Sequence, residues 1–209
     1  MKITVFGATG QTGQQVVQQA LDKDYEVTAV VRDPSRLGLS HERLRVVRAD
    51  LFDPESIAPA VNGSDAVISA LGATSRKPTS VCEAGVRSII RAMRATGVRR
   101  LVVVSNSAHT PADGDSAARR LFVFVLGRIL KNPFADLRLM EQEIQGSGLD
   151  WTIVRPARMT NGTQAGRYRT ALGGHVPAGW SVARADVADS VLRLLGDDTT
   201  VRNVVGVAY

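Results

Sequence analysis

The chain has 209 residues, of which 44% are hydrophobic, enough for one domain of ordinary size with a substantial core. Its formal net charge is +6, but the basic residues occur along the whole chain, mostly as singles and pairs, and aromatic residues make up only 5%. This distribution argues against a nucleic-acid-binding surface of clustered arginines with interleaved aromatics. It favours an electropositive field that attracts an anionic cofactor or substrate.

Cys82 is the only cysteine, which excludes an internal disulfide and fits a reducing compartment. We interpret it as a small core residue rather than a nucleophile. The first predicted strand follows Met1 directly, which leaves no room for a signal peptide, and no apolar run approaches bilayer length. We therefore expect a cytoplasmic protein with no membrane partner. We also expect no metal site, because His41, His109 and His175 are not spaced as ligands with one another or with Cys82.

The first predicted element is a buried strand, Lys2–Phe6, and the second is an amphipathic helix over residues 14–23. Glycines recur at every third position between them. Gly7 allows a tight turn, Gly10 lets the backbone approach a phosphate without an intervening Cβ, and Gly13 lets the helix pack closely on the sheet. The helix N-terminus directs free N–H groups and a partial positive charge toward the same point. The turn therefore predicts the pyrophosphate site of a dinucleotide, formed by Gly7, Thr9, Gly10, Gln11, Thr12 and Gly13.

Residues 25–31 form the second predicted strand, and Arg32 follows it. NAD-selective folds of this type carry an acidic side chain there for the ribose 2′-hydroxyl, whereas a guanidinium matches a 2′-phosphate. Arg36 reaches the other side of the same phosphate if the intervening residues form a short helical turn. We therefore predict NADP(H) as the cofactor. Two solvated surface arginines are the alternative, and the carboxylate of Asp33 leaves some use of NAD(H) open.

Strands and helices alternate along the rest of the chain. The further predicted strands are Leu44–Arg48, 66–71, 101–104, 151–154 and 204–207. The further predicted helices are Pro54–Val61, 79–96, 136–146 and 186–195. This alternation predicts a doubly wound α/β fold of the Rossmann type, in which one parallel sheet lies between two layers of helices. We interpret residues 1–209 as a single NAD(P)-binding domain whose C-terminal part forms the substrate cleft.

Local residues indicate where two of the helices begin or end. Asp53 before Pro54 is typical of an N-cap with proline at the first helical position, and Gly97 is typical of a helix C-terminus. Residues 119–134 are too apolar for a free surface helix. Three interpretations of this segment stay open: it covers the active-site cleft, it packs on a partner chain, or it is buried in its own core.

The topology predicts further cofactor contacts, because ligands in this fold bind at the carboxyl ends of the strands. Asp50 and Leu51 follow the third strand and are expected near the adenine, where Asp50 could accept a hydrogen bond from the amino group. Leu71 and Gly72 follow the fourth strand and are expected to pass close under the cofactor. Turn chemistry alone would also account for either pair.

Four segments together resemble a known family: 7–13 (GATGQTG), 30–33 (VVRD), 65–68 (DAVI) and 147–156 (SGLDWTIVRP). They are similar to the atypical short-chain dehydrogenase/reductases, and within these to the NAD(P)H-binding, NmrA-like branch that includes flavin reductase, also called biliverdin IXβ reductase. The similarity extends over nearly the whole chain, including residues 184–188. It implies hydride transfer from NADPH to a flavin or a linear tetrapyrrole, and it adds Pro156 to the cofactor contacts. It is more specific for fold and cofactor than for substrate.

The wider superfamily uses a Tyr-x-x-x-Lys pair, in which the tyrosine phenol exchanges a proton with an alcohol or ketone. At the position that we match to this pair, the chain has Phe134 and Arg138 instead. Tyr25, Tyr168 and Tyr209 have no lysine four residues further on. Ketone or alcohol chemistry by that route is therefore disfavoured. Conjugated acceptors such as flavins, quinones or linear tetrapyrroles remain, because they accept a hydride first and then take a proton from water.

Three residues are candidates for contact with the reacting groups. Ser107 matches the serine that these reductases place near the nicotinamide, and it is the predicted catalytic residue; a local backbone contact is the alternative. The family has a histidine after the sixth strand, where this chain has Arg158, which could bind a phosphate, a carboxylate or a reduced flavin but cannot act as an acid near neutral pH. His109 is a candidate proton donor, against a structural or solvated role. We predict Arg158 and His109 as substrate-binding residues.

We therefore predict an NADPH-dependent oxidoreductase that acts on a small-molecule acceptor, as a monomer or small homo-oligomer. The missing tyrosine and the Arg158 replacement leave a rival hypothesis open, an NmrA-like regulator that senses NADP(H) without turnover. An isomerase or epimerase of a nucleotide-linked substrate is a third hypothesis, against which the absent Tyr-Lys pair counts.

Overall fold

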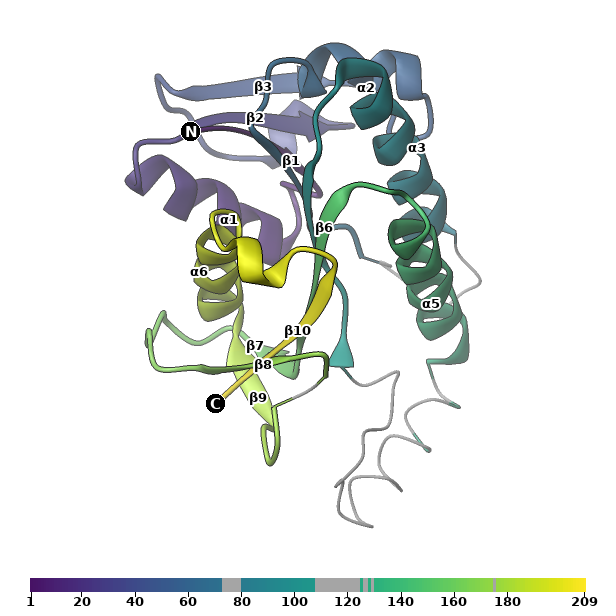
Figure 1. Ribbon diagram of the computed structural model, residues 1–209. Coiled ribbons are helices and arrows are strands. Elements are labelled where there is room, and N and C mark those ends of the chain that lie inside the picture. Colours follow the sequence, from purple (N-terminus) through teal and green to yellow (C-terminus); the bar gives the residue numbers. More distant parts are fainter. Residues whose placement is uncertain (73–79, 108–124, 126–127, 129, 175) are drawn as a thin grey trace.

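The computed structural model describes residues 1–72, 80–107, 125, 128, 130–174 and 176–209. At its centre is an eight-stranded sheet in the order β3-β2-β1-β4-β5-β6-β10-β8, in which every strand is parallel to its neighbours except β8 (Figure 1). The bounds of these strands are β1 Lys2–Phe6, β2 Glu26–Val31, β3 Leu44–Arg48, β4 Ala66–Ser69, β5 Arg100–Val104, β6 Asp150–Pro156, β8 Arg169–Leu172 and β10 Asn203–Ala208.

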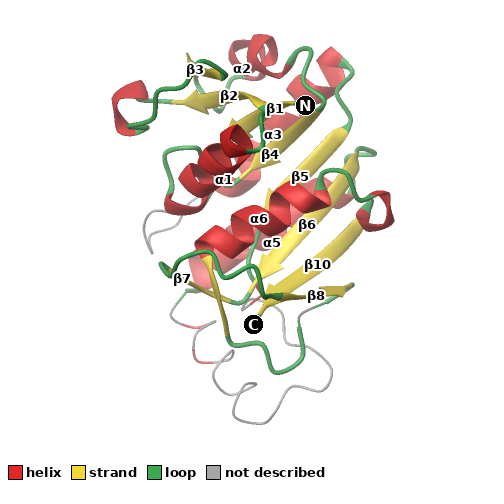
Figure 2. Cartoon of the chain, turned by 90° about the vertical axis from the view of Figure 1, so that its left-hand side faces the viewer, coloured by secondary structure: helices red, strands yellow, loops and turns green. Residues whose placement is uncertain are grey.

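Helices cover both faces of the sheet (Figures 1 and 2). One face carries α1 (Gln11–Asp22) and α6 (Arg184–Leu194). The other face carries α2 (Pro54–Val61), α3 (Val81–Thr96) and α5 (Lys131–Gln145). Two short strands, β7 (Arg158–Thr160) and β9 (Ser181–Ala183), form a separate parallel pair, and two 3₁₀ turns are η1 (Pro34–Arg36) and η3 (Asp198–Thr200). The predicted doubly wound α/β fold is confirmed.

The central strands are apolar on both faces because a hydrophobic core lies on each face of the sheet. In β1, Ile3 and Val5 pack in the core under α1 and α6, whereas Phe6 packs in the core under α2, α3 and α5. All three side chains are almost completely buried. Burial on both faces is the reason that these strands are nearly continuous apolar runs rather than alternating ones. Cys82 belongs to the second core, as its interpretation as a small core residue predicts.

The predicted helix caps are present, and one further cap comes from a distant residue. Asp53 accepts a hydrogen bond from the N–H of Glu55 at 3.0 Å at the start of α2, and Gly97 ends α3 with a φ of +75°. The α3 N-terminus is capped from α5, because the buried carboxylate of Asp136 accepts the backbone N–H groups of Cys82 and Glu83 at 3.1 and 2.9 Å. This tertiary cap joins the two helices on the same face of the sheet.

Some element bounds differ from the prediction for local physical reasons. The α5 helix begins at Lys131 rather than at residue 136, because Pro133 lies in its first turn, where a missing N–H leaves no hydrogen bond unmade. Strands β7, β8 and β9 were not predicted. They are only three or four residues long, so they carry little periodic signal of their own. Among the described residues, no helix has both the length and the apolar character needed to cross a bilayer.

Candidate functional site

The turn between β1 and α1 depends on glycine for steric reasons. Gly7 has a φ of +75°, and a Cβ there would lie 2.5 Å from the carbonyl oxygen of Ala70. A Cβ on Gly13 would lie 2.1 Å from the carbonyl oxygen of Gly7, so only glycine allows the first turn of α1 to pack this closely on the preceding loop. Gly10 is the N-cap of α1 and has no side chain to bond the first N–H groups of the helix. These donors are therefore available to an anion.

Two cavities open beside this turn and share four lining residues: Gly10, Ala70, Leu71 and Gly72. The β2 cavity, of about 250 Å³, lies at the end of β2, and the β5 cavity, of about 720 Å³, lies at the end of β5. Because they share these residues, they form one cleft across the junction of β1 and β4, where the strand order reverses. This junction at the carboxyl ends of the strands is where doubly wound folds bind nucleotides.

The β2 cavity presents two guanidinium groups. Arg32 and Arg36 both line it, and the expected helical turn between them is the 3₁₀ turn η1. Asp33 caps that turn, since its Oδ1 accepts hydrogen bonds from the hydroxyl and the backbone N–H of Ser35 at 2.7 and 3.1 Å. These two bonds hold the pKa of the Asp33 carboxyl below its ordinary value. The carboxylate is therefore engaged within the turn and does not line the cavity.

The outer side of the β2 cavity is apolar. Leu51 and Phe52 line it, and Phe52 is 49% exposed, which leaves its ring available to stack on a flat heterocycle. Leu51 was predicted as a cofactor contact and Phe52 was not, although an aromatic residue soon after the third predicted strand was a usable signal. Asp50 is not among the lining residues. Its Oδ1 accepts the N–H of Phe52 at 3.0 Å, which is the turn chemistry considered as the alternative.

The β5 cavity has two walls of different character. The wall from α5 is apolar and consists of Leu130, Pro133, Phe134 and Leu137. The opposite wall, from α1, β7 and α6, consists of Gln11, Thr12, Met159 and Arg184. Phe134 thus lies in the cavity at the position that we matched to the superfamily tyrosine. None of the described lining residues carries a group that exchanges a proton near neutral pH.

A buried hydrogen-bond network supports the end of β5. Ser105 lines the β5 cavity and donates its hydroxyl to Glu141 Oε1 at 2.6 Å. Arg155 Nε donates to the same oxygen at 3.0 Å, and Arg155 Nη2 pairs with Glu141 Oε2. Ser105 and Glu141 are each 4% exposed. The network fixes the position of Ser105. Ser105 and the neighbouring Asn106 are lining residues that were not predicted as site residues.

The remaining predicted site residues differ in whether they line the cleft. Thr9 lines the β2 cavity. Ser107 is 5% exposed and is not among the described residues that line either cavity, and Pro156 is buried at the end of β6. Arg158 is exposed at the start of β7 and also lines neither cavity. His109, like most of the segment 119–134, falls outside the described residues.

Two of the tyrosines are bonded to acidic residues of α6. Tyr168 donates its hydroxyl to Asp189 at 2.8 Å, and Tyr209 donates to Asp186 at 2.6 Å. Burial, followed by these bonds, raises the pKa of both phenols above the ordinary value. Their hydroxyls therefore hold the C-terminal part of the domain together and lie in neither cavity.

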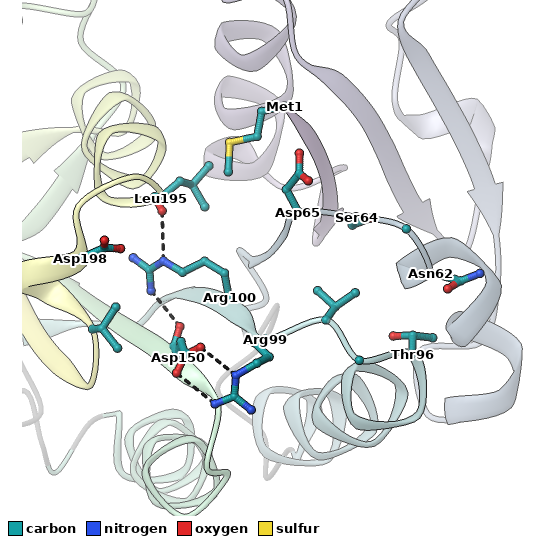
Figure 3. A pocket seen from close by; sticks show the side chains of 14 residues that line it. Met1, Asn62, Ser64, Asp65, Thr96, Arg99, Arg100, Asp150, Leu195 and Asp198 are labelled. Carbon is teal, nitrogen blue, oxygen red and sulfur yellow. Dashed lines mark hydrogen bonds and ion pairs between the residues drawn. The ribbon is translucent and has the colours of Figure 1, made fainter.

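A further cavity of about 870 Å³ lies at the opposite, amino edge of the sheet (Figure 3). Two of its charged groups, the guanidiniums of Arg99 and Arg100, are bonded within the protein. Arg99 Nε donates to Asp150 Oδ2 at 2.9 Å, and Arg100 donates to the carbonyl oxygens of Asp150 and Leu195 at 2.9 and 3.1 Å. Desolvation lowers the pKa of Arg100. The bond from Arg100 to Leu195 caps the C-terminus of α6, and we assign this cavity a structural role.

The sequence is similar to known proteins over most of its length. The model of a family described as NAD(P)H-binding matches residues 7–198. An uncharacterised chloroplast protein of Arabidopsis thaliana is 32% identical over 184 residues, which are 79% of this chain but 61% of that protein's length. YhfK of Bacillus subtilis, named an uncharacterised sugar epimerase, is 29% identical over 208 residues, 96% of this chain and 90% of that protein.

The fold is also similar to that of solved structures. The anaerobillin reductase ChuY from Escherichia coli O157:H7 superimposes with a TM-score of 0.80 over 100% of this chain and 97% of that one. The sequence identity is 21%, so this similarity concerns the fold.

Proposed function

The chain belongs to the NAD(P)H-binding family, and on that basis we propose that it is an NADPH-dependent reductase that transfers a hydride to a flavin or a similar conjugated acceptor. The observation that carries this proposal is the composition of the cleft. Two guanidinium groups lie at its β2 end, the glycine turn lies at its centre, and a cavity with an apolar α5 wall lies at its β5 end.

The residues of the cleft fit the cofactor. The turn has no room for a Cβ at Gly7 or Gly13, and the first N–H groups of α1 are uncapped, which suits a diphosphate held close to the backbone. Arg32 and Arg36 would hold the 2′-phosphate, and Phe52 would stack on the adenine. When bound, NADPH supplies the hydride.

The β5 cavity suits an acceptor that needs no proton from the protein. Its α5 wall, with Pro133, Phe134 and Leu137, provides an apolar surface for a flat ring system and excludes water from that side. Ser105 and Asn106 provide polar groups that can orient the nicotinamide carboxamide or the acceptor. Because no described lining residue donates a proton near neutral pH, acceptors that take a proton from water after hydride transfer are favoured over simple ketones. We keep Ser107 as the proposed catalytic serine.

The test is to follow NADPH absorbance with FMN, FAD, riboflavin, a quinone and biliverdin at micromolar protein. We expect oxidation with at least one of these acceptors, and a lower kcat in Ser107→Ala. The Ser105→Ala variant shows whether the lining serine carries that role instead. Tight NADPH binding without oxidation by any acceptor would support the NADP(H)-sensing regulator, and no binding of either nicotinamide nucleotide would contradict both functions.

A further inference from the structure

The β5 cavity combines an apolar wall with one positive charge. Among the described residues that line it, Arg184 is the single charged side chain. Arg184 is the first residue of α6 and lies in the wall opposite Phe134 and Leu137. A molecule that fills this cavity therefore meets hydrocarbon on one side and a guanidinium on the other.

The guanidinium of Arg184 is held in place but only partly used. Its Nη1 donates to Asn161 Oδ1 at 2.6 Å and makes a longer contact of 3.5 Å with the carbonyl oxygen of Met159. Within the described part of the chain, its Nε and Nη2 groups have no acceptor and no carboxylate pairs with it. The side chain is half-buried, so its unused donors are suited to a charged ligand that replaces water.

The nearest acid along the helix does not neutralise Arg184. Asp186 is fully buried, and its Oδ1 accepts the N–H of Gly166 at 2.8 Å while its Oδ2 accepts the hydroxyl of Tyr209 at 2.6 Å. The carboxylate is therefore engaged away from the cavity. Among the described residues, no carboxylate therefore neutralises Arg184.

We propose that Arg184 is the anion-binding residue of the acceptor site, and that the acceptor is a flat conjugated molecule bearing a phosphate or a carboxylate. Its ring system packs on the α5 wall, and its anionic group binds the guanidinium on the opposite wall. This inference rests on the proposed reductase function and deepens it. It also moves the anion-binding role from Arg158, which is exposed and outside the cavity, to Arg184.

Paired acceptors that differ in charge test the proposal directly. Calorimetry on the full chain saturated with NADP⁺ measures binding of FMN against riboflavin, and of biliverdin against its dimethyl ester. We expect at least one anionic member to bind more tightly than its neutral counterpart. Arg184→Gln should weaken binding of that member by about 10- to 100-fold and leave the neutral one and NADP⁺ unchanged. Arg184→Lys should retain part of the affinity because it keeps the charge.

Two control variants separate a local contact from the overall charge. Arg167→Gln removes the same charge from an exposed residue that lines neither cavity, and it should bind the anionic acceptor like the native protein. Arg158→Gln tests the residue that the sequence favoured. The proposal would be overturned if Arg158→Gln weakened binding of the anionic acceptor and Arg184→Gln did not. It would also be overturned if Arg184→Gln weakened binding of the anionic acceptor, the neutral acceptor and NADP⁺ equally.

The outcomes also separate this inference from the reductase function. Equal binding of charged and neutral members in the native protein, or binding of neither, overturns the anion-binding role even where NADPH is oxidised. Suppose that the native protein binds the anionic member selectively, that Arg184→Gln abolishes this binding, and that no NADPH is oxidised. This result supports the role of Arg184 and overturns the reductase function. The comparison within the native protein stands even if a variant fails to fold.

Discussion

Replacing Arg32 by alanine should remove most of the preference of the β2 cavity for NADPH over NADH. Arg32 follows the last residue of β2 and lines the cavity together with Arg36. No described carboxylate forms an ion pair with either guanidinium, and Asp33 is engaged with Ser35. Both groups are therefore available to a phosphate at the end of the strand.

The expected magnitude follows from the exposure of the two side chains. A hydrogen bond to a charged group contributes about 1.5–3 kcal/mol, and both arginines are exposed, so solvent screening places Arg32 at the low end. A loss of about 1–2 kcal/mol raises the Kd of NADPH roughly 5- to 30-fold. The Kd of NADH should not change, because NADH has no 2′-phosphate. If both arginines bind one phosphate, the Arg32→Ala and Arg36→Ala losses should not be additive in the double variant.

Calorimetric titration of each variant with NADPH and with NADH measures these values. Raising the ionic strength should shrink the effect on NADPH, because exposed charges are screened. Arg45→Ala is the matched control, since Arg45 is an exposed arginine of β3 that lines neither cavity. Equal losses for NADPH and NADH in Arg32→Ala, or the same loss in Arg45→Ala, would refute the assignment.

Three further predictions concern the framework of the site. Gly13→Ala should weaken binding of both cofactors and lower the melting temperature, because its Cβ would lie 2.1 Å from the carbonyl oxygen of Gly7; an unchanged protein would contradict this. Asp136→Ala should cost about 1–2 kcal/mol in urea unfolding, because it uncaps α3, and Asp136→Asn should cost less. The raised pKa of Tyr168 stabilises the fold below pH 10.0, the ordinary pKa, and this contribution is lost as pH rises toward the folded-state pKa. The melting temperature, measured up to about pH 11, should therefore fall less steeply with pH above pH 10 in Tyr168→Phe than in the native protein.

Much of the fold could be predicted from the sequence because its elements are locally specified. The strand Leu44–Arg48 and the helix Pro54–Val61 have the predicted bounds, the latter because Asp53 and Pro54 define its start within two residues. Strands β7, β8 and β9 could not be predicted, because they are positioned by strand pairing and not by patterns of their own. Strand β8 pairs with β10, and β7 and β9 pair with each other. The cap of α3 by Asp136 could not be predicted either, since Asp136 is more than 50 residues from the N–H groups that it accepts.

The candidate site likewise has one part that could be predicted from the sequence and one part that could not. The glycine turn and the Arg32–Arg36 pair lie on short continuous segments, so the sequence alone predicted that they line one cleft, with two guanidiniums at one end. The β5 cavity draws on α1, β5, α5, β7 and α6, segments separated by many residues. Only the tertiary structure placed Arg184 and Phe134 in one cavity and Arg158 outside it. Short-range steric and capping rules act within a few residues, whereas the walls of this cavity exist only once the two helical layers have packed on the sheet.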